Sequence, residues 1–234
     1  MFFDFLQQSI QARFTPVRTL KDTPAKQILL LRHTGTGALA VQRTFSGSAA
    51  VYQRLLRVDC PNLPHVLEAA ESGGRVLVLE EFIPGDGLAS LLEGGRTLAP
   101  AQAVRVARDV CGALWALHCL GIVHRDVKPA NIILRGDPAV LIDLDAARQY
   151  DQSLQRDTQV LGTMGYASPE QFGLSQTDQR TDIYALGVTL NIMLTGAHPA
   201  RALAPGRLGR VVQRCTMVSP EKRYPNVLRL MAAL

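Results

Sequence analysis

The chain has 234 residues, 47% of them hydrophobic, and a formal net charge of +5. This length suits one large domain or two small lobes with a sizeable core. The basic residues are spread along the chain and do not form a tail, so the charge predicts no nucleic-acid-binding arm. The four cysteines have neither CxxC nor metal-ligand spacing, which is typical of buried thiols in a reducing compartment.

The first residues, MFFDFLQQSI, do not have the pattern of a secretory signal, because the apolar part is short and contains Asp4. No apolar run approaches the ~18 residues that a transmembrane helix needs. We therefore expect a cytoplasmic protein whose partners include neither a membrane nor a nucleic acid.

The first part of the chain has the pattern of a β-sheet. Residues 27–45 contain two apolar runs around the Thr-Gly-Thr-Gly segment at 34–37, which is a hairpin signal. Residues 49–58 have helical spacing, with apolar side chains on one side. Residues 75–82 are typical of a buried strand, and the Pro and Gly residues within 84–87 predict a break between two lobes.

The second part of the chain has the pattern of a helical lobe. Pro100 is placed to open a helix that keeps its apolar period until Gly121. Residues 139–145 predict a short strand. Residues 181–196 are apolar on almost every side, which favours a helix buried in the middle of the lobe. A short helix is expected from Pro225 to Leu234.

The run IVHRDVKPANIIL at residues 122–134 concentrates polar groups suited to chemistry. Its pattern His-Arg-Asp-x-Lys-Pro-x-Asn resembles the catalytic loop of eukaryotic-type protein kinases. The resemblance implies that Asp126 accepts or orients the proton of the substrate hydroxyl. It implies that Lys128 offers positive charge to the moving phosphoryl group and that Asn131 holds a metal ion. The alternative for these residues is a polar loop that caps the preceding helix.

Later segments match the same family in the same order. In LIDLDAAR, Asp143 matches the Mg²⁺ ligand of the kinase Asp-Phe-Gly segment, and Asp145 replaces its Gly, an uncomfortable change in a tight turn. In GTMGYASPE, Thr163 matches the Thr that contacts the catalytic Asp and Lys of Ser/Thr kinases. Three further matches imply structural roles. They are Asp182, which would brace the catalytic loop, and Glu170 with Arg223, which would form an ion pair.

The resemblance covers residues 14 to 234 and implies one kinase-like domain of the α+β class. A small β-rich N-lobe is expected at about 14–82, a hinge at about 80–87 and a larger helical C-lobe at about 88–234. ATP and Mg²⁺ or Mn²⁺ are the implied cofactors, and the implied partner is a protein or peptide substrate, the chain itself included. Five residues are expected to line the adenine site: Ile28, Ala40 and Ile133 with their side chains, and Glu80 and Phe82 with the hinge backbone.

The nucleotide-binding part departs from the family pattern. The three Gly positions of the GxGxxG loop are occupied by Lys21, Thr23 and Lys26, and Pro24 removes a backbone donor. The matching run for Val-Ala-Ile-Lys is Leu39 to Gln42, so a neutral residue stands where the family has Lys.

Two consequences follow for the charges near the nucleotide. Arg43 is expected on the outward side of its strand, because adjacent strand residues face opposite ways. The helix that follows has Val51 near the position of the Lys partner Glu. With-no-lysine kinases supply their cation from the third Gly position, so Lys26 is a candidate for the phosphate contact. The alternative is that Lys26 is a solvated loop charge.

Three functions are consistent with the sequence. The first is a Ser/Thr protein kinase with weak or atypical nucleotide binding, and the second is a pseudokinase that acts as a binding or regulatory module. The third is a small-molecule kinase, against which Lys128 and GTMGYASPE count. In the first case, Arg125 is of the type that pairs with a phosphorylated activation segment, where Ser153 and Thr158 are candidates.

Overall fold

The structure is a computed structural model that describes residues 2–150, 163–172 and 177–234. The chain divides into two compact units. The N-terminal unit comprises Met1–Cys60 and Pro64–Ile83, and the C-terminal unit comprises Pro61–Leu63 and Pro84–Leu234. One unit is built on a sheet and the other on helices, which is the predicted two-lobed α+β class. In the described part of the chain, no helix is both long and apolar enough to cross a membrane.

The N-terminal unit is a five-stranded antiparallel sheet with a helix on each face. Its strands lie in the order β1-β2-β3-β5-β4. Their bounds are β1 Phe14–Thr23, β2 Lys26–His33, β3 Leu39–Ser46, β4 Val66–Ser72 and β5 Arg75–Glu81. The helices are α1 Phe2–Arg13 and α2 Ala50–Leu55. The β2–β3 hairpin and β5 confirm the sequence-based predictions.

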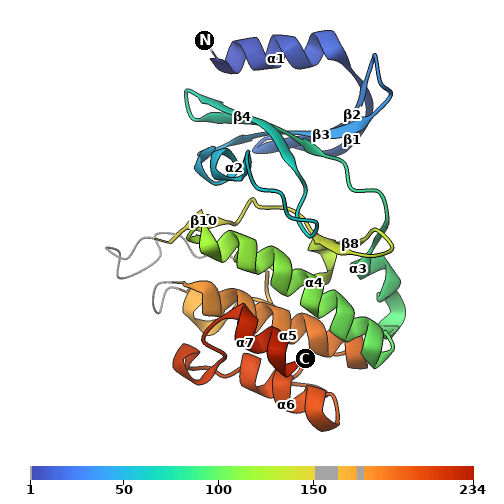
Figure 1. Cartoon of the computed structure of the whole chain (residues 1–234), viewed down its shortest axis with the longest axis vertical. Helices are drawn as coiled ribbons and strands as arrows, with labels where there is room; N and C mark the ends of the chain where they lie inside the picture. Colours follow the sequence, from blue (N-terminus) through green and yellow to red (C-terminus); the bar gives the residue numbers. More distant parts are fainter. Residues whose placement is uncertain (1, 151–162, 173–176) are drawn as a thin grey trace. The chain divides into compact units, whose positions relative to one another are not determined.

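Helices α1 and α2 lie on opposite sides of the sheet (Figure 1). Strand alternation directs the side chains of each strand toward one helix or the other. One face packs against α1 in a buried cluster, whose members are Phe3, Leu6, Ile10, Leu31, Ala40, Ala70, Leu77 and Leu79. On the other face, the ring of Phe45 lies 5.9 Å from that of Tyr52 in α2. The sequence analysis did not predict α1, although Phe3, Leu6 and Ile10 have the spacing of one helical face.

The C-terminal unit is mostly helical, with two small sheets of order β6-β8-β9 and β10-β7. Its strands are β6 Asp86–Gly87, β7 Ile122–Val123, β8 Ile132–Leu134, β9 Ala139–Leu141 and β10 Arg148–Gln149. Its α-helices are α3 Leu88–Leu91, α4 Pro100–Cys119, α5 Gln179–Thr195, α6 Gly206–Cys215 and α7 Val227–Ala233. Short 3₁₀ helices are η1 Glu93–Gly95, η2 Pro129–Asn131, η3 Pro169–Phe172 and η4 Pro220–Lys222.

The ends of the long helices follow from local residues. Helix α4 has Pro100 in its first turn, and Gly121 adopts φ 69° just beyond its end. The side chain of Asp178 accepts a hydrogen bond from Arg180 N at the start of α5, and Gly196 ends that helix in the left-handed conformation. Figure 1 shows α5 beside α4 in the body of this unit. These helices confirm the predicted ones, and most of α5 is buried, as its apolar sequence predicted.

A buried ion pair ties the segment before α5 to the loop before α7. Nη1 of Arg223 donates to Oε1 of Glu170 at 2.6 Å, and Nη2 donates to Oε2 at 2.8 Å. Burial raises the pKa of Glu170, but the hydrogen bonds and charge of Arg223 lower it more, so the pKa lies below its usual value. The hydroxyl of Thr181 also donates to Oε1. The structure thus confirms the pairing predicted for these two residues.

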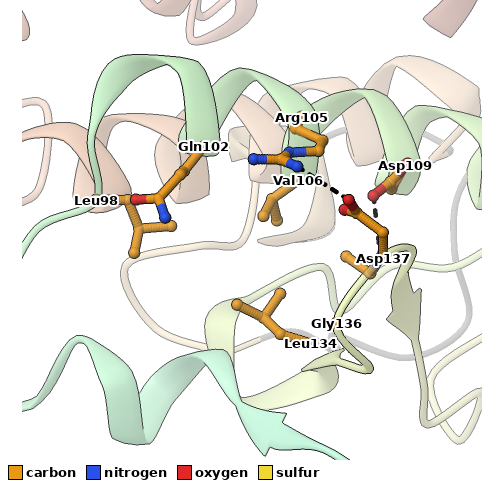
Figure 2. Close-up of a pocket in the computed structure, with 9 residues that line it drawn as sticks. Leu98, Gln102, Arg105, Val106, Asp109, Leu134, Gly136 and Asp137 are labelled. Atoms are coloured by element: carbon orange, nitrogen blue, oxygen red, sulfur yellow. Dashed lines mark hydrogen bonds and ion pairs between the residues drawn. The ribbon is translucent and has the colours of Figure 1, made fainter.

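Replacing Arg223 with Leu should lower the free energy of unfolding by about 3–5 kcal/mol, because it leaves the Glu170 carboxylate buried without its partner. The control is Arg105→Ala. It breaks the Arg105–Asp137 pair, which is exposed beside a cavity under α4 (Figure 2), and should cost less than about 1 kcal/mol. Urea unfolding followed by fluorescence of Trp115, which lies in α4, measures both changes. Equal losses in the two variants would contradict the structural role of Glu170 and Arg223.

Candidate active site

The loop between β7 and η2 carries the kinase-like motif and is held by one buried carboxylate. Oδ2 of Asp182 accepts a hydrogen bond from His124 N at 2.9 Å, and Oδ1 accepts one from Arg125 N at 2.7 Å. Arg125 adopts φ 68°, a conformation that non-glycine residues rarely take. The two hydrogen bonds that Asp182 accepts therefore hold the backbone in a strained turn just before Asp126. The bracing role predicted for Asp182 is confirmed.

The charge state of this anchor is set by two histidines. Burial raises the pKa of Asp182, but the hydrogen bond from His118 Nε2 at 2.8 Å, the charge of His118 and the hydrogen bond from the His124 amide lower it more. The resulting pKa lies below the usual value, so Asp182 is ionised at neutral pH. Burial lowers the pKa of His124 in spite of the carboxylates around it. Nδ1 of His124 accepts a hydrogen bond from Asp126 N, as a neutral imidazole does.

The structure brings Asp126, Lys128, Asn131 and Thr163 into one hydrogen-bonded network. Nζ of Lys128 donates to Asp126 Oδ2 at 2.7 Å and to Thr163 Oγ1 at 2.6 Å. The Thr163 hydroxyl donates to Asp126 Oδ1 at 2.7 Å. Nδ2 of Asn131 donates to the backbone oxygen of Asp126 at 2.9 Å and to its Oδ2 at 3.0 Å. The network holds the Asp126 carboxylate through hydrogen bonds to both of its oxygens.

Asn131 and Asp143 lie at the same end of the β8–β9 hairpin. Ile142 N donates to Asn131 O at 2.8 Å, directly beyond the paired residues of the two strands. Nδ2 of Asn131 donates to Asp126, and Oδ1 is the acceptor atom of the same amide. An amide oxygen and a carboxylate are the hard oxygen ligands that Mg²⁺ prefers, so these two residues fit the ion.

The Asp-Phe-Gly-like segment departs from one expectation. Asp143 adopts φ 67°, whereas Asp145 is not among the residues with positive φ. The backbone strain therefore falls on Asp143, which matches the metal ligand. Asp145, in the position of the family's Gly, does not need a positive φ. Leu144 is buried, which suits its place in the position of the family's Phe.

In the N-terminal unit, the register of β3 corrects the sequence-based prediction. Gln42 pairs with Leu79 and so faces α1, whereas Arg43 pairs with Val78 and lies on the face that packs against α2. In protein kinases the strand Lys pairs with a Glu of the helix that follows the strand. The Lys therefore lies on the face of the sheet that this helix covers. Arg43 lies on that face of the sheet, whereas Gln42 lies on the face that packs against α1.

The prediction that Arg43 points outward was also wrong. Arg43 is only 5% exposed, and its Nε donates a hydrogen bond to Oε1 of Glu80 at 2.6 Å. The physical reason is the alternation of β3, in which Val41, Arg43 and Phe45 share one face. The two large apolar neighbours indicate that this face is also buried, and this signal contradicts an outward Arg43.

The residues expected to line the adenine site are not all on one surface. Ile28 pairs with Arg43 and lies on the α2 face, whereas Ala40 belongs to the cluster under α1, so these two do not line the same slot. Val41, next in the strand, is on the face of Ile28. Ile133 lies in β8 of the other unit. Glu80 is in β5 and Phe82 follows that strand, in accord with their expected place at the end of the N-terminal unit.

The tip of the β1–β2 hairpin contains the residues that the sequence comparison placed at the Gly-rich loop. Pro24 and Ala25 form the turn, and the Thr23 hydroxyl donates to Lys26 O at 3.0 Å and accepts from Lys26 N at 3.1 Å. Lys21 and Thr23 lie within β1, and Lys26 begins β2. The residues matched to the three Gly positions are therefore ordinary strand residues. The turn itself is made by the two residues between Thr23 and Lys26.

Two residues that the sequence analysis did not single out also hold the catalytic loop. His118 in α4 binds Asp182, and Gln171 in η3 donates from Nε2 to Arg125 O at 2.9 Å while its Oε1 accepts from Ser168 N. No local pattern distinguishes either side chain from an ordinary buried polar residue. The candidate phosphorylation sites Ser153 and Thr158 lie outside the described residues.

The lowered pKa of His124 predicts a pH-dependent stability. Below about pH 6.5 the unfolded chain protonates this imidazole while the folded chain keeps it neutral, so the free energy of unfolding should fall as the pH drops. The lowered pKa of Asp182 adds a further loss below about pH 4. Urea unfolding between pH 8 and 5 should show a shallower slope for His124→Gln than for the wild type. An unchanged slope would contradict the neutral state of His124.

Comparison with known proteins gives the family. Residues 49–223 match the protein kinase domain family. The chain is 38% identical over 154 residues to the serine/threonine-protein kinase PknD of Mycobacterium tuberculosis, covering 65% of this chain and 23% of that protein. It is 36% identical over 154 residues to PknH of Mycobacterium bovis, covering 65% and 26% of the two chains. It is 37% identical over 145 residues to PknE of Mycobacterium tuberculosis, covering 61% and 26%.

Each of these alignments therefore covers only about a quarter of the relative's length. The family match includes the catalytic loop, the Asp143 segment, Thr163 and the Glu170–Arg223 pair. The chain belongs to the protein kinase domain family, among relatives that are bacterial serine/threonine-protein kinases.

Proposed function

We propose that the chain is a Ser/Thr protein kinase that transfers the γ-phosphoryl group of ATP to a hydroxyl of a protein or peptide. One observation carries the proposal: Asp126, Lys128, Asn131 and Thr163 form a complete hydrogen-bonded network on a braced loop. Phosphoryl transfer needs little covalent help from the protein, so positioned charge supplies most of the catalysis.

The residues of this network have distinct roles in the proposed reaction. The substrate hydroxyl oxygen forms a bond to the γ-phosphorus, the bond to the bridging oxygen breaks, and ADP leaves. Asp126 accepts the hydroxyl proton. A carboxylate has four lone-pair sites, and the three side-chain donors on Asp126 leave it capacity for the substrate. Lys128 offers positive charge to the phosphoryl group, and Thr163 keeps Lys128 and Asp126 aligned.

Asn131 and Asp143 are the proposed ligands of Mg²⁺ or Mn²⁺, and their oxygens fit such an ion. A bound metal would neutralise the charge of the phosphate oxygens. The strained φ of Asp143 and the tie between Ile142 N and Asn131 O fix the backbone from which both ligands project. This part of the site is therefore organised by the chain itself.

The substrate class follows from Thr163 and from the region after α5. The contacts of Thr163 with both Asp126 and Lys128 favour Ser and Thr over Tyr and count against a small-molecule acceptor. Between His198 and Ser219 the only described α-helix is α6. This short region supports a flexible peptide, or the chain itself, as the substrate.

The second candidate is a pseudokinase that binds a partner or nucleotide with little transfer. Three features favour it: a hairpin tip without Gly, Gln42 where the sequence places the strand Lys, and no acidic residue in α2. The buried Arg43 weakens the second of these, because it supplies a cation on the α2-covered face. Measured phosphate transfer separates the two candidates.

The chain should transfer phosphate from γ-labelled ATP to itself or to a basic protein substrate in the presence of Mg²⁺ or Mn²⁺. Asp143→Ala should lower the rate by at least about a hundredfold, because it removes a proposed metal ligand. The matched control is Asp137→Ala, which removes an exposed carboxylate in the same unit and should keep the wild-type rate. Folded wild-type protein without transfer in either metal would favour the pseudokinase.

A further inference from the structure

The net positive charge of the chain is concentrated in residues 196–234. This stretch contains seven basic residues and one acidic residue, whereas residues 1–195 contain 18 basic and 19 acidic residues. Basic residues occur along the whole chain, but in this stretch they are denser and almost no acidic residue balances them. Stable protein surfaces commonly intersperse the two signs of charge, and a region of one sign attracts ligands of the opposite sign.

Three of the basic residues share one side of α6. Arg207, Arg210 and Arg214 are three and four positions apart, so they lie on the same side of the helix, and all three are exposed. Val212 and Cys215 lie on another side of α6 and are buried, and the helix packs against α5. Figure 1 shows α6 on the far side of α5 from α4, at the outside of the C-terminal unit. We call these three exposed arginines the arginine face.

The contacts of the arginine face within the chain involve no carboxylate side chain. Nη2 of Arg207 donates to the backbone oxygen of Leu234. The guanidinium carbon of Arg214 lies 4.4 Å from the centroid of the Tyr224 ring, in a cation–π contact. Arg210, between them, forms no hydrogen bond or ion pair with any residue that the structure describes. The two outer side chains are therefore positioned, while the charge of all three is left for a ligand.

The acidic residue of this stretch does not serve the arginine face. Glu221 accepts a hydrogen bond from Ser219 Oγ at 2.6 Å, and its Oε1 lies 3.9 Å from Nη1 of Arg180 in α5. Like charges three or four residues apart destabilise a helix, and no carboxylate side chain from the described segments offsets this repulsion in α6. An acidic ligand would relieve the repulsion without first breaking an internal ion pair.

We propose that the arginine face binds a short acidic segment of a partner protein. Each guanidinium matches a carboxylate through two parallel hydrogen bonds. The arginine face is about 10 Å long, because a helix rises about 1.5 Å per residue. Roughly three residues of extended chain span this length, so a short run of Asp or Glu is sufficient. The inference does not depend on phosphate transfer by the chain.

The apolar side chains around α6 favour a protein over a nucleic acid or a membrane. Leu203 precedes the helix and Met217 and Val218 follow it, and all three are exposed, which suits apolar residues at the two ends of an acidic segment. Single-stranded nucleic acids stack on aromatic rings, whereas the large apolar residues exposed in this stretch are these three and Leu228. Membrane-bound helices insert an apolar side, but that side of α6 is already packed within the unit.

The test measures the binding of labelled peptides to the whole chain by fluorescence anisotropy. The probe is a run of Glu residues flanked by Leu, and its control is the same peptide with Gln in place of Glu. We expect the chain to bind the Glu peptide and not the Gln peptide. The affinity should fall as salt rises from about 0.05 M to about 0.5 M, because the paired charges are exposed.

Arg210→Glu should weaken binding of the Glu peptide by about tenfold or more, because it replaces an attraction by a repulsion. Arg210→Gln, which only removes the charge, should give a smaller loss. Arg210 has no hydrogen bond or ion pair to lose within the described chain, so both variants should fold as the wild type does. The matched control is Arg18→Glu, which makes the same change of charge at an exposed position of β1 and should keep the wild-type affinity.

Three results would overturn the inference. The first is a chain that binds neither peptide. The second is an equal loss of affinity in Arg210→Glu and Arg18→Glu, which would mean that the overall charge of the chain decides binding. The third is a single-stranded RNA or a vesicle of anionic lipid that binds through Arg210 more tightly than the Glu peptide does.

Discussion

The buried carboxylate of Asp182 is the constraint on which the catalytic part of the chain depends. It accepts hydrogen bonds from two backbone amides of the motif loop and from the imidazole of His118. These bonds hold Arg125 in a strained conformation. The turn then presents Asp126 to Lys128, Asn131 and Thr163. A side chain in the first turn of a buried helix thus organises a site whose reacting groups come from three other segments.

The C-terminal unit was predictable because its signals are local. Pro100, Asp178 and Gly196 mark helix ends by their backbone chemistry, and the motif from His124 to Asn131 keeps a fixed spacing within one loop. Contacts such as those of Gln171 and His118 with the loop depend on how distant elements pack, and no sequence pattern distinguishes them. The sequence therefore identified the residues of the Asp126 network, but it did not identify the contacts of Gln171 and His118 that support the loop.

The N-terminal unit shows how strand alternation decides which residue of β3 faces which helix. Matching Gln42 to the strand Lys of kinases makes the unit lack its cation, whereas the observed alternation of β3 puts Arg43 on the α2 face. Alternation was visible in Val41 and Phe45, but the pairing of Arg43 with Glu80 depends on β3 lying beside β5 in the sheet. Helix α1 was missed for another reason, because its apolar spacing was weighed only as a targeting signal.

We propose that the network around Asp126 acts on Ser and Thr hydroxyls. The decisive experiment is to incubate the purified chain with Mg²⁺, γ-labelled ATP and a basic protein, and to identify the phosphorylated amino acids after hydrolysis. We expect phosphoserine and phosphothreonine. Label found only on tyrosine, or no label on protein while ATP remains bound, would overturn this proposal.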